Sequence, residues 1–370
     1  SAMRLALALL AVLCASCVHS STFSANIFPT QSGFSQASGP PGLRVDTYTG
    51  NSKSTPGNVG LCISGGGSRS LSLAWGQLRA LYQLGLLSQT KAISSVSGGT
   101  WASIPYTFLP DTIDDATFLG PYVSDLSQLT LTGLANSDKS TTLDYLFPGS
   151  LGNVPTSDGL DPITAPGTLY QWYQNGYPAD RLWIRLIGEN VLKPFGLWDA
   201  DSEHFPTRFF CPDTATCEAI KTANPNLGNY FAVNPNNRPF HIAMTSMFVR
   251  PTGEAASDTY KYVAPVHSTA WHTGIPSSPA ATYQDASGTD QSVGGGGVTS
   301  FAFNSQITSN PDSSNGVSVT QTRPFALADI TGASSAAFAE EFTNKLHILQ
   351  DVDPSFDYWT VQNPTPGVSG

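Results

Sequence analysis

A run of three glycines, Gly65 to Gly67, places the strongest constraint on the fold of this chain of 370 residues. The residues before it, Val59 to Ile63, form a short apolar run with β-branched ends, which is typical of a buried strand. After it, apolar residues recur at helical spacing between Ser70 and Leu84, and Gly85 follows where a helix would end. The order strand, glycine loop, helix indicates the start of an α/β fold.

A second apolar run, Ala92 to Val96, predicts another strand, which leads through a tight turn into a short predicted helix from Thr100 to Phe108. The turn contains Ser95-Val96-Ser97-Gly98-Gly99, a variant of Gly-x-Ser-x-Gly. In such a nucleophile elbow the serine occupies a strained turn between strand and helix, so the residues two before and two after it must be small. Ser95 and Gly99 satisfy this requirement, and Ser97 is therefore the candidate nucleophile.

The spacing of the two glycine-rich turns predicts that they form one site. Ser97 lies 30 positions after Gly67, the length of one strand-loop-helix-strand crossover, which brings both turns to the carboxyl edge of adjacent parallel strands. Successive glycines can present backbone N–H groups either to a phosphate or to an oxyanion. Neither a Gly-x-Gly-x-x-Gly fingerprint nor a Gly-Lys-Ser/Thr loop is present, so the pattern favours the oxyanion hole.

These motifs resemble the catalytic start of the cytosolic phospholipase A2 and fungal lysophospholipase group, within the patatin-like superfamily. The matching residues are Gly65 to Arg69 and Ser97-Gly98-Gly99-Thr100-Trp101, and the segments Phe118 to Val123 and Phe325 to Phe338 look similar to the same group. The resemblance is specific over about 57–108 and looser up to about 345. It implies a three-layer α/β/α fold with a central, mainly parallel sheet and an inserted cap region at about 110–240.

The resemblance also implies a role for each residue of the site. Ser97 would attack the ester carbonyl of a phospholipid or lysophospholipid at a lipid surface, the N–H groups of Gly66 and Gly67 would stabilise the oxyanion, and Arg69 would bind the lipid phosphate. Members of the family use a Ser-Asp dyad without histidine, and no metal or cofactor is expected. This agrees with elementary chemistry, because a serine needs an adjacent base and each oxyanion donor contributes about 2.7–4 kcal/mol.

The catalytic aspartate is the main departure from the family pattern, in which it lies in an Asp-Gly or Asp-Ser context late in the domain. Asp158 falls in the expected insertion and Asp285 in a loop, so neither is a good candidate. Asp329 is the fallback within the chain, although we expect it to be a helix N-terminal or structural residue. The preferred interpretation is a base beyond Gly370 in a chain that is incomplete at its C-terminus.

Alternatives to the dyad remain open at this point. His241, His267 and His272 could supply the base of a His-dependent α/β-hydrolase esterase, although such an enzyme lacks a triple-glycine arginine loop in this position. A lipid-binding homologue without a base, and acyl transfer to an alcohol other than water, are further hypotheses. Trp101 and Tyr106 could belong to the core or line an acyl pocket.

The N-terminal segment and the composition favour a secreted or lumenal protein. Residues 1–20 read as a signal peptide, because a basic head at Arg4 precedes an apolar run that is too short to span a bilayer. A lipoprotein signal at Cys17 is disfavoured by Cys14, which stands where a branched aliphatic residue is needed. Charged residues make up only 12%, and 17 basic against 27 acidic residues argue against nucleic acid and against electrostatic docking on anionic membranes.

The cysteines predict one disulfide. Cys211 and Cys217 flank a polar, turn-rich loop, which in an oxidising compartment favours a local disulfide. A zinc site is the alternative, but no second Cys/His pair is spaced to complete it. Cys62, within the first apolar run, is expected to be a buried thiol.

Composition divides the chain into a linker or arm at 21–56 and a catalytic domain at 57–370, whose folded part begins near Val59. Within the insertion, Arg181 to Leu192 has a helical pattern. Strands are predicted at Phe240–Val249 and near Val298–Phe303, with a loop-rich region at 251–297 between them, and a final helix at Ser334–Leu349.

Overall fold

The computed structural model describes residues 21–29, 59–120, 124–125, 127, 165–177, 179–200, 206–236, 238–251, 262–276, 281–284, 290–321 and 323–335. The expected signal peptide, most of the expected linker, Asp158, Asp285 and the region beyond 335 lie outside these residues. No helix of the described ranges has the length and apolar character needed to cross a bilayer.

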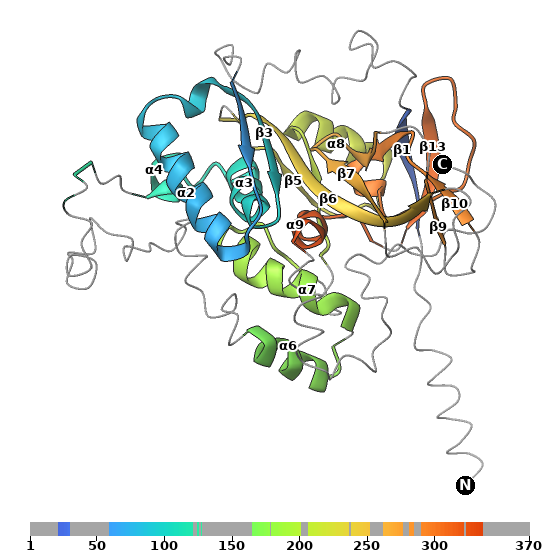
Figure 1. Cartoon of the computed structure of the whole chain (residues 1–370). Helices are drawn as coiled ribbons and strands as arrows, with labels where there is room; N and C mark the ends of the chain where they lie inside the picture. The colour runs from blue at the N-terminus through green and yellow to red at the C-terminus, as the bar shows by residue number, and fades with distance from the viewer. Residues whose placement is uncertain are drawn as a thin grey trace.

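The strand, loop and helix units around the two glycine-rich turns are confirmed. β2 (Val59–Ile63) leads into α2 (Gly67–Gln83), and β3 (Thr90–Val96) leads into α3 (Gly98–Phe108), with a short 3-10 helix at Leu87–Gln89 before β3. β2 and β3 are parallel neighbours, and Ile63 pairs with Ser95. β3 is also parallel to β6 (Phe240–Pro251), so the two glycine-rich turns follow adjacent strands at the same edge of the sheet (Figure 1).

The sheet is mixed, which corrects the expectation of a mainly parallel one. Outward from β6, the described strand pairs are all antiparallel, and several of them join consecutive strands through short connections. The remaining strands of the sheet are β1 (Ser21–Pro29), β7 (Tyr262–Ser268), β8 (His272–Ile275), β9 (Ala281–Gln284), β10 (Asp290–Val293), β11 (Gly296–Thr299), β12 (Gln306–Ile307) and β13 (Gly316–Gln321). A separate parallel pair consists of β4 (Phe209–Cys211) and β5 (Tyr230–Ala232). The fold is therefore α/β with parallel pairing concentrated at the glycine-rich turns.

Two other expectations were wrong. The first nine residues of the expected linker form β1, which lies inside the sheet between β11 and β13, so the folded part begins well before Val59. The region expected to be loop-rich contains β7 to β10. The strand predicted near Val298–Phe303 is found in part as β11, which ends at Thr299 and continues as a 3-10 turn. The last described helix is α9 (Leu327–Ser334), and most of the expected final helix at Ser334–Leu349 lies outside the described residues.

One helical layer packs on the parallel part of the sheet. α3 is buried at every residue, α2 and α9 contact it, and α7 (Ala179–Ile187) lies against α9. Figure 1 shows α7 and α6 (Ala165–Gln174) stacked below α9, and the helical prediction for 181–192 is confirmed by α7 and the π-helical turn Gly188–Leu192 that follows it. Helices α6 and α7 of the expected cap thus pack into the main core, while Phe209 and Leu227 belong to a second hydrophobic cluster.

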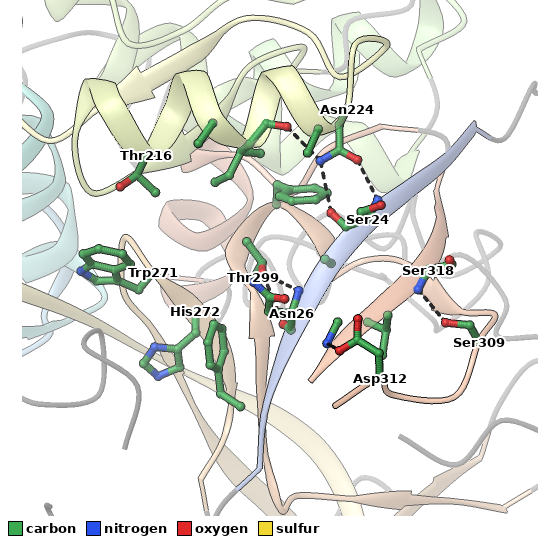
Figure 2. Close-up of a pocket in the computed structure, with 18 of the residues that line it drawn as sticks. Ser24, Asn26, Thr216, Asn224, Trp271, His272, Thr299, Ser309, Asp312 and Ser318 are labelled. Atoms are coloured by element: carbon green, nitrogen blue, oxygen red, sulfur yellow. Dashed lines mark hydrogen bonds between the residues drawn. The ribbon is translucent and has the colours of Figure 1, made fainter. Parts of the chain in front are cut away.

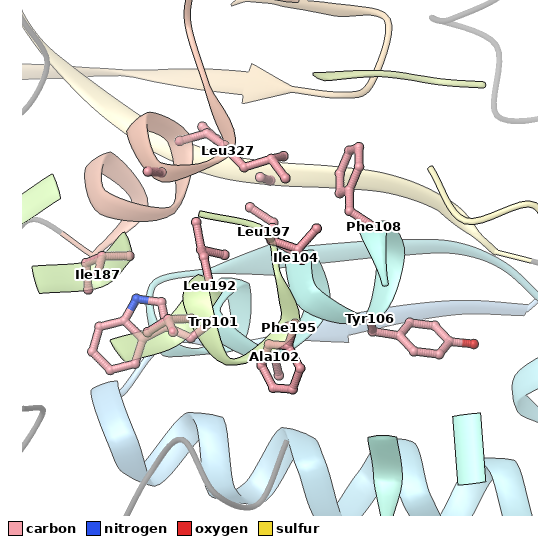
Figure 3. Close-up of a cluster of buried hydrophobic side chains, with 14 of the residues drawn as sticks. Trp101, Ala102, Ile104, Tyr106, Phe108, Ile187, Leu192, Phe195, Leu197 and Leu327 are labelled. Atoms are coloured by element: carbon pink, nitrogen blue, oxygen red, sulfur yellow. The ribbon is translucent and has the colours of Figure 1, made fainter. Parts of the chain in front are cut away.

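The core of this layer is built around α3, as Figure 3 shows. Trp101 and Tyr106, which sequence reasoning could not assign, are both core residues. They belong to the same cluster of buried side chains as residues of segment 187–197 and Leu327 of α9. A helix that is apolar on all sides must be enclosed in this way, and its burial fixes the position of the turn from which it starts.

The opposite face of β2 and β3 carries no described helix, and this explains an error in the sequence analysis. Side chains of a strand alternate between the two faces, so Ile63 is buried while Cys62 is exposed rather than part of the core. The predicted disulfide between Cys211 and Cys217 is confirmed. It joins β4 to α8 (Thr214–Ala223), with the two Cα atoms 5.6 Å apart.

Candidate active site

Ser97 has the backbone conformation of a nucleophile elbow. It stands between β3 and α3 with φ 56° and ψ −128°, and it is half-buried. A positive φ is rare for a residue with a side chain and costs about 1–3 kcal/mol, so it persists only when the surroundings hold it. Among the described non-glycine residues only Asn315 shares this property. The strain supports the prediction that Ser97 is a functional residue.

The glycine loop packs directly against the elbow. A Cβ atom added to Gly65 would lie 2.9 Å from Ser97 Cβ and 3.5 Å from Ser97 Oγ, and one added to Gly98 would lie 2.7 Å from the carbonyl carbon of Gly67. A Cβ atom on Gly99 would lie 2.9 Å from the carbonyl oxygen of Ile63. Glycine is therefore needed at these positions because the two turns touch through their backbones. The predicted convergence of the two motifs is found in the structure.

Two helix N-termini meet beside Ser97. α2 begins at Gly67 after the cap residue Gly66, α3 begins at Gly98 after the cap residue Ser97, and neither start has a side-chain cap. Uncapped first-turn N–H groups carry partial positive charge and stabilise an anion. The arrangement can therefore stabilise the oxyanion of a tetrahedral intermediate at Ser97. Arg69 lies exposed in the first turn of α2.

Sequence reasoning missed one residue at the elbow, Ser334 at the end of α9. The backbone N–H of Ser97 donates to Ser334 Oγ at 2.8 Å, so this N–H is not a free oxyanion donor. The two residues are 237 positions apart, and no local pattern could have joined them. Ser334 falls within the segment Phe325 to Phe338, so the family resemblance was the one signal that pointed to its neighbourhood.

His241 lies below the elbow in a cluster of hydroxyl groups. Its Nε2 atom is 2.8 Å from Ser103 Oγ and 3.3 Å from Ser95 Oγ, and Ser103 Oγ donates to Ser95 Oγ at 2.7 Å. Complete burial lowers the pKa of His241 to about 3, so the imidazole is neutral at neutral pH. These bonds join the imidazole to Ser95 and Ser103 rather than to Ser97 Oγ, which does not support a histidine base.

The other two histidines are also structural. His267 lies on β7 and His272 on β8, and burial lowers the pKa of both, to about 4 for His272. His272 Nδ1 lies 3.1 Å from Thr269 Oγ1, and its ring contacts Phe28. In the described part of the chain, Ser97 Oγ makes no hydrogen bond to an imidazole or a carboxylate.

Asp329 is a structural residue, as expected. It is fully buried, and its two carboxylate oxygens accept hydrogen bonds from the Arg323 guanidinium at 2.6 and 2.7 Å. One of them also accepts from the backbone N–H of Ala326, the cap residue of α9. A carboxylate whose oxygens are both held by a guanidinium is not placed to accept the proton of Ser97.

A separate cavity of about 730 Å³ is lined by residues of β1, β11, β13 and α8. In Figure 2, β1 lies along this cavity, between α8 and the loop that carries Asp312. Its walls combine polar and apolar groups, including Asn26, Trp271 and His272. Its described lining residues include neither Ser97 nor the glycine loop, so it is distinct from the elbow.

Solved structures, rather than family models or curated proteins, are similar to this chain. No family model and no curated protein matches the chain. A solved structure of human GIVD cytosolic phospholipase A2 is similar to this chain, with 14% sequence identity and a TM-score of 0.38. A structure of the same protein in complex with a methyl gamma-linolenyl fluorophosphonate inhibitor and terbium chloride has 15% identity and a TM-score of 0.36. The matches cover 83% and 81% of this chain but only 32% and 34% of those proteins. At these values a common function does not follow, so function is inferred from the site.

Proposed function

We propose that this chain is a serine acyl hydrolase that cleaves fatty-acyl esters of phospholipids or lysophospholipids through an acyl-Ser97 intermediate. The observation that carries the proposal is the strained backbone of Ser97 between two uncapped helix N-termini. Strain at an accessible serine and unpaired N–H groups beside it are what acyl transfer requires.

In the proposed reaction, Ser97 Oγ attacks the ester carbonyl and loses its proton to a general base. The N–H groups of Gly66 and Gly67 stabilise the oxyanion, the intermediate collapses to the acyl-serine and the alcohol, and water then releases the fatty acid. A donor of this kind contributes about 2.7–4 kcal/mol. The proposal assigns the base to an aspartate outside the described residues, since Asp329 is held by Arg323.

The proposed substrate carries a phosphate and is met at a lipid surface. Arg69 supports the first point, because an exposed guanidinium in the first turn of α2 can bind a phosphate bidentately. Leu73 and Leu84, which are more than 60% exposed, support the second, because they offer apolar contacts on or next to the same helix. We also propose a secreted or lumenal location, and the disulfide supports it because disulfides form in oxidising compartments.

The test compares Ser97→Ala with Ser88→Ala, an exposed serine whose hydroxyl bonds only to the carbonyl of Gly85. Release of fatty acid from a lysophospholipid should be lost in the first variant and unchanged in the second. Hydrolysis at the wild-type rate by Ser97→Ala would refute the proposal.

A lipid-binding protein without a base is the second candidate, because no described carboxylate or imidazole bonds to Ser97 Oγ. It predicts that the wild-type protein associates with lipid vesicles but releases no fatty acid. If acyl products form, their analysis in the presence of glycerol separates hydrolysis from transfer to an alcohol.

A further inference from the structure

Ser334 lies at the C-terminal end of α9, far from Ser97 in the sequence but next to it in space. We infer that Ser334 is a positioning residue, which acts through the backbone of Ser97 to hold the nucleophile in its strained conformation. The inference rests on the proposed function as far as catalysis is concerned. Its structural part, the anchoring of the Ser97 backbone, stands independently.

Three hydrogen bonds meet at the Ser334 hydroxyl. Ser334 Oγ donates to the carbonyl oxygen of Met244 at 2.6 Å, accepts from the backbone N–H of Ser97 at 2.8 Å, and lies 2.9 Å from Thr100 Oγ1. A hydroxyl has one proton and two lone pairs. Because the proton of Ser334 is used on the Met244 carbonyl, the third bond needs the proton of Thr100, which also lies within reach of Ser95 Oγ at 3.3 Å. All three capacities of the hydroxyl are therefore satisfied.

These bonds connect three separate elements at the point where the strain is located. Ser97 is the elbow, Thr100 lies in the first turn of α3, and Met244 lies on β6, the strand next to β3. Ser334 itself is only 8% exposed, so water has little access to replace it. Removing its hydroxyl would leave the Ser97 N–H and the Met244 carbonyl unpaired, which costs about 1–3 kcal/mol for each buried group.

The hydrogen bond from the Ser97 N–H to Ser334 Oγ, which we call the anchor, has a second, chemical consequence. An N–H group that is bound to Ser334 cannot turn toward a substrate, so it leaves the oxyanion to the glycine loop and the start of α3. It also helps to set where Ser97 Oγ points, because the bond holds the peptide group that precedes Ser97 Cα. A displacement of about 1 Å at a reacting atom can cost about 100-fold in rate.

A hydroxyl cluster supports the anchor from below. Thr100 Oγ1 lies 3.3 Å from Ser95 Oγ, which is in turn bonded to Ser103 Oγ. All of these residues are buried. The anchor is thus part of a continuous polar contact between α9 and the elbow strand, inside an otherwise apolar layer.

The test compares Ser334→Ala with Ser335→Ala. Ser335 is the adjacent residue, is fully buried, and donates only to carbonyls of its own helical turn, those of Thr331 and Gly332. We expect labelling of Ser97 by a fluorophosphonate, and kcat on a lysophospholipid, to fall about 10-fold or more in Ser334→Ala. In Ser335→Ala both should stay within about twofold of wild type. KM should change little in either variant.

Two further measurements separate positioning from a loss of folding. Ser334→Thr keeps the hydroxyl and should restore most of the labelling rate, while thermal melting shows whether each variant is folded. Hydrogen exchange of the peptide that contains Ser97 should accelerate at least about 10-fold in Ser334→Ala but not in Ser335→Ala, because the anchored N–H loses its acceptor.

The outcomes distinguish the two claims. Equal labelling and equal exchange in the two alanine variants would overturn the positioning role. If the wild-type protein is not labelled at all, the proposed function fails, and the exchange result alone decides whether Ser334 anchors the elbow.

Discussion

Replacing Gly98 with alanine tests the contact between the glycine loop and the elbow, on which the oxyanion hole depends. The new Cβ atom would lie 2.7 Å from the carbonyl carbon and 2.8 Å from the nitrogen of Gly67, both backbone atoms that cannot rotate away. The loop must therefore move away from Ser97. Such overpacking costs about 1–3 kcal/mol of stability, and the loss of one aligned oxyanion donor costs about 10²–10³ in kcat.

Gly76 provides the matched control. It lies exposed in the middle of α2, and a Cβ atom there would meet nothing within 4 Å. Gly76→Ala should stabilise the protein by about 0.4–1 kcal/mol and leave the chemistry unchanged. The assay is the rate of fluorophosphonate labelling at a temperature where both variants are folded. Labelling of Gly98→Ala at the rate of Gly76→Ala would refute the assignment of the glycine loop as the oxyanion hole.

Two predictions concern stability. Asp329→Asn leaves the Arg323 guanidinium buried without its counter-charge and should lower the free energy of unfolding by about 3–5 kcal/mol, measured by urea denaturation; a loss below about 1 kcal/mol would show that the pair is not structural. Burial holds the pKa of His241 at about 3, below its value of 6.5 in an unfolded chain. Between about pH 3 and pH 6.5, therefore, only the unfolded state binds a proton at His241. Stability from this group is complete above pH 6.5 and is lost as pH falls toward 3. His241→Gln should therefore lose less stability than wild type between pH 7 and pH 5, and an unchanged pH dependence would contradict this.

The elbow region could be predicted from the sequence because its information is local. Glycines at Gly65 to Gly67 and at Gly98 and Gly99 are required by backbone contacts between two turns that one crossover brings together. The 30-residue spacing was therefore enough to predict the parallel strands and the convergence of the two turns. The assignment of Ser97 as the nucleophile, made from the elbow motif, stays a prediction. Asp329 was also interpreted correctly, since an acidic residue three positions after the N-cap residue often caps a helix start.

The antiparallel part of the sheet could not be predicted in the same way. β1 pairs with β13 across almost three hundred residues, so its partner cannot be read from neighbouring sequence. Phe23, Ala25 and Ile27 do alternate with polar residues, but this short run opens a segment whose composition is typical of a linker. β7 to β10 are short strands in a region whose composition is typical of loops. Their pairing partners, rather than their own residues, determine that they are strands. Cys62 was misassigned because a short apolar run does not reveal that one face of its strand is open.

The most direct test of the central claim is to treat the folded protein with a lipid-like fluorophosphonate and to identify the modified residue by peptide mass spectrometry. The strained conformation and the two helix N-termini predict a single adduct on Ser97, which is lost in Ser97→Ala and retained in Ser88→Ala. A protein that binds lipid vesicles but forms no adduct, or one that is modified at another serine, would contradict the assignment of Ser97 as the nucleophile.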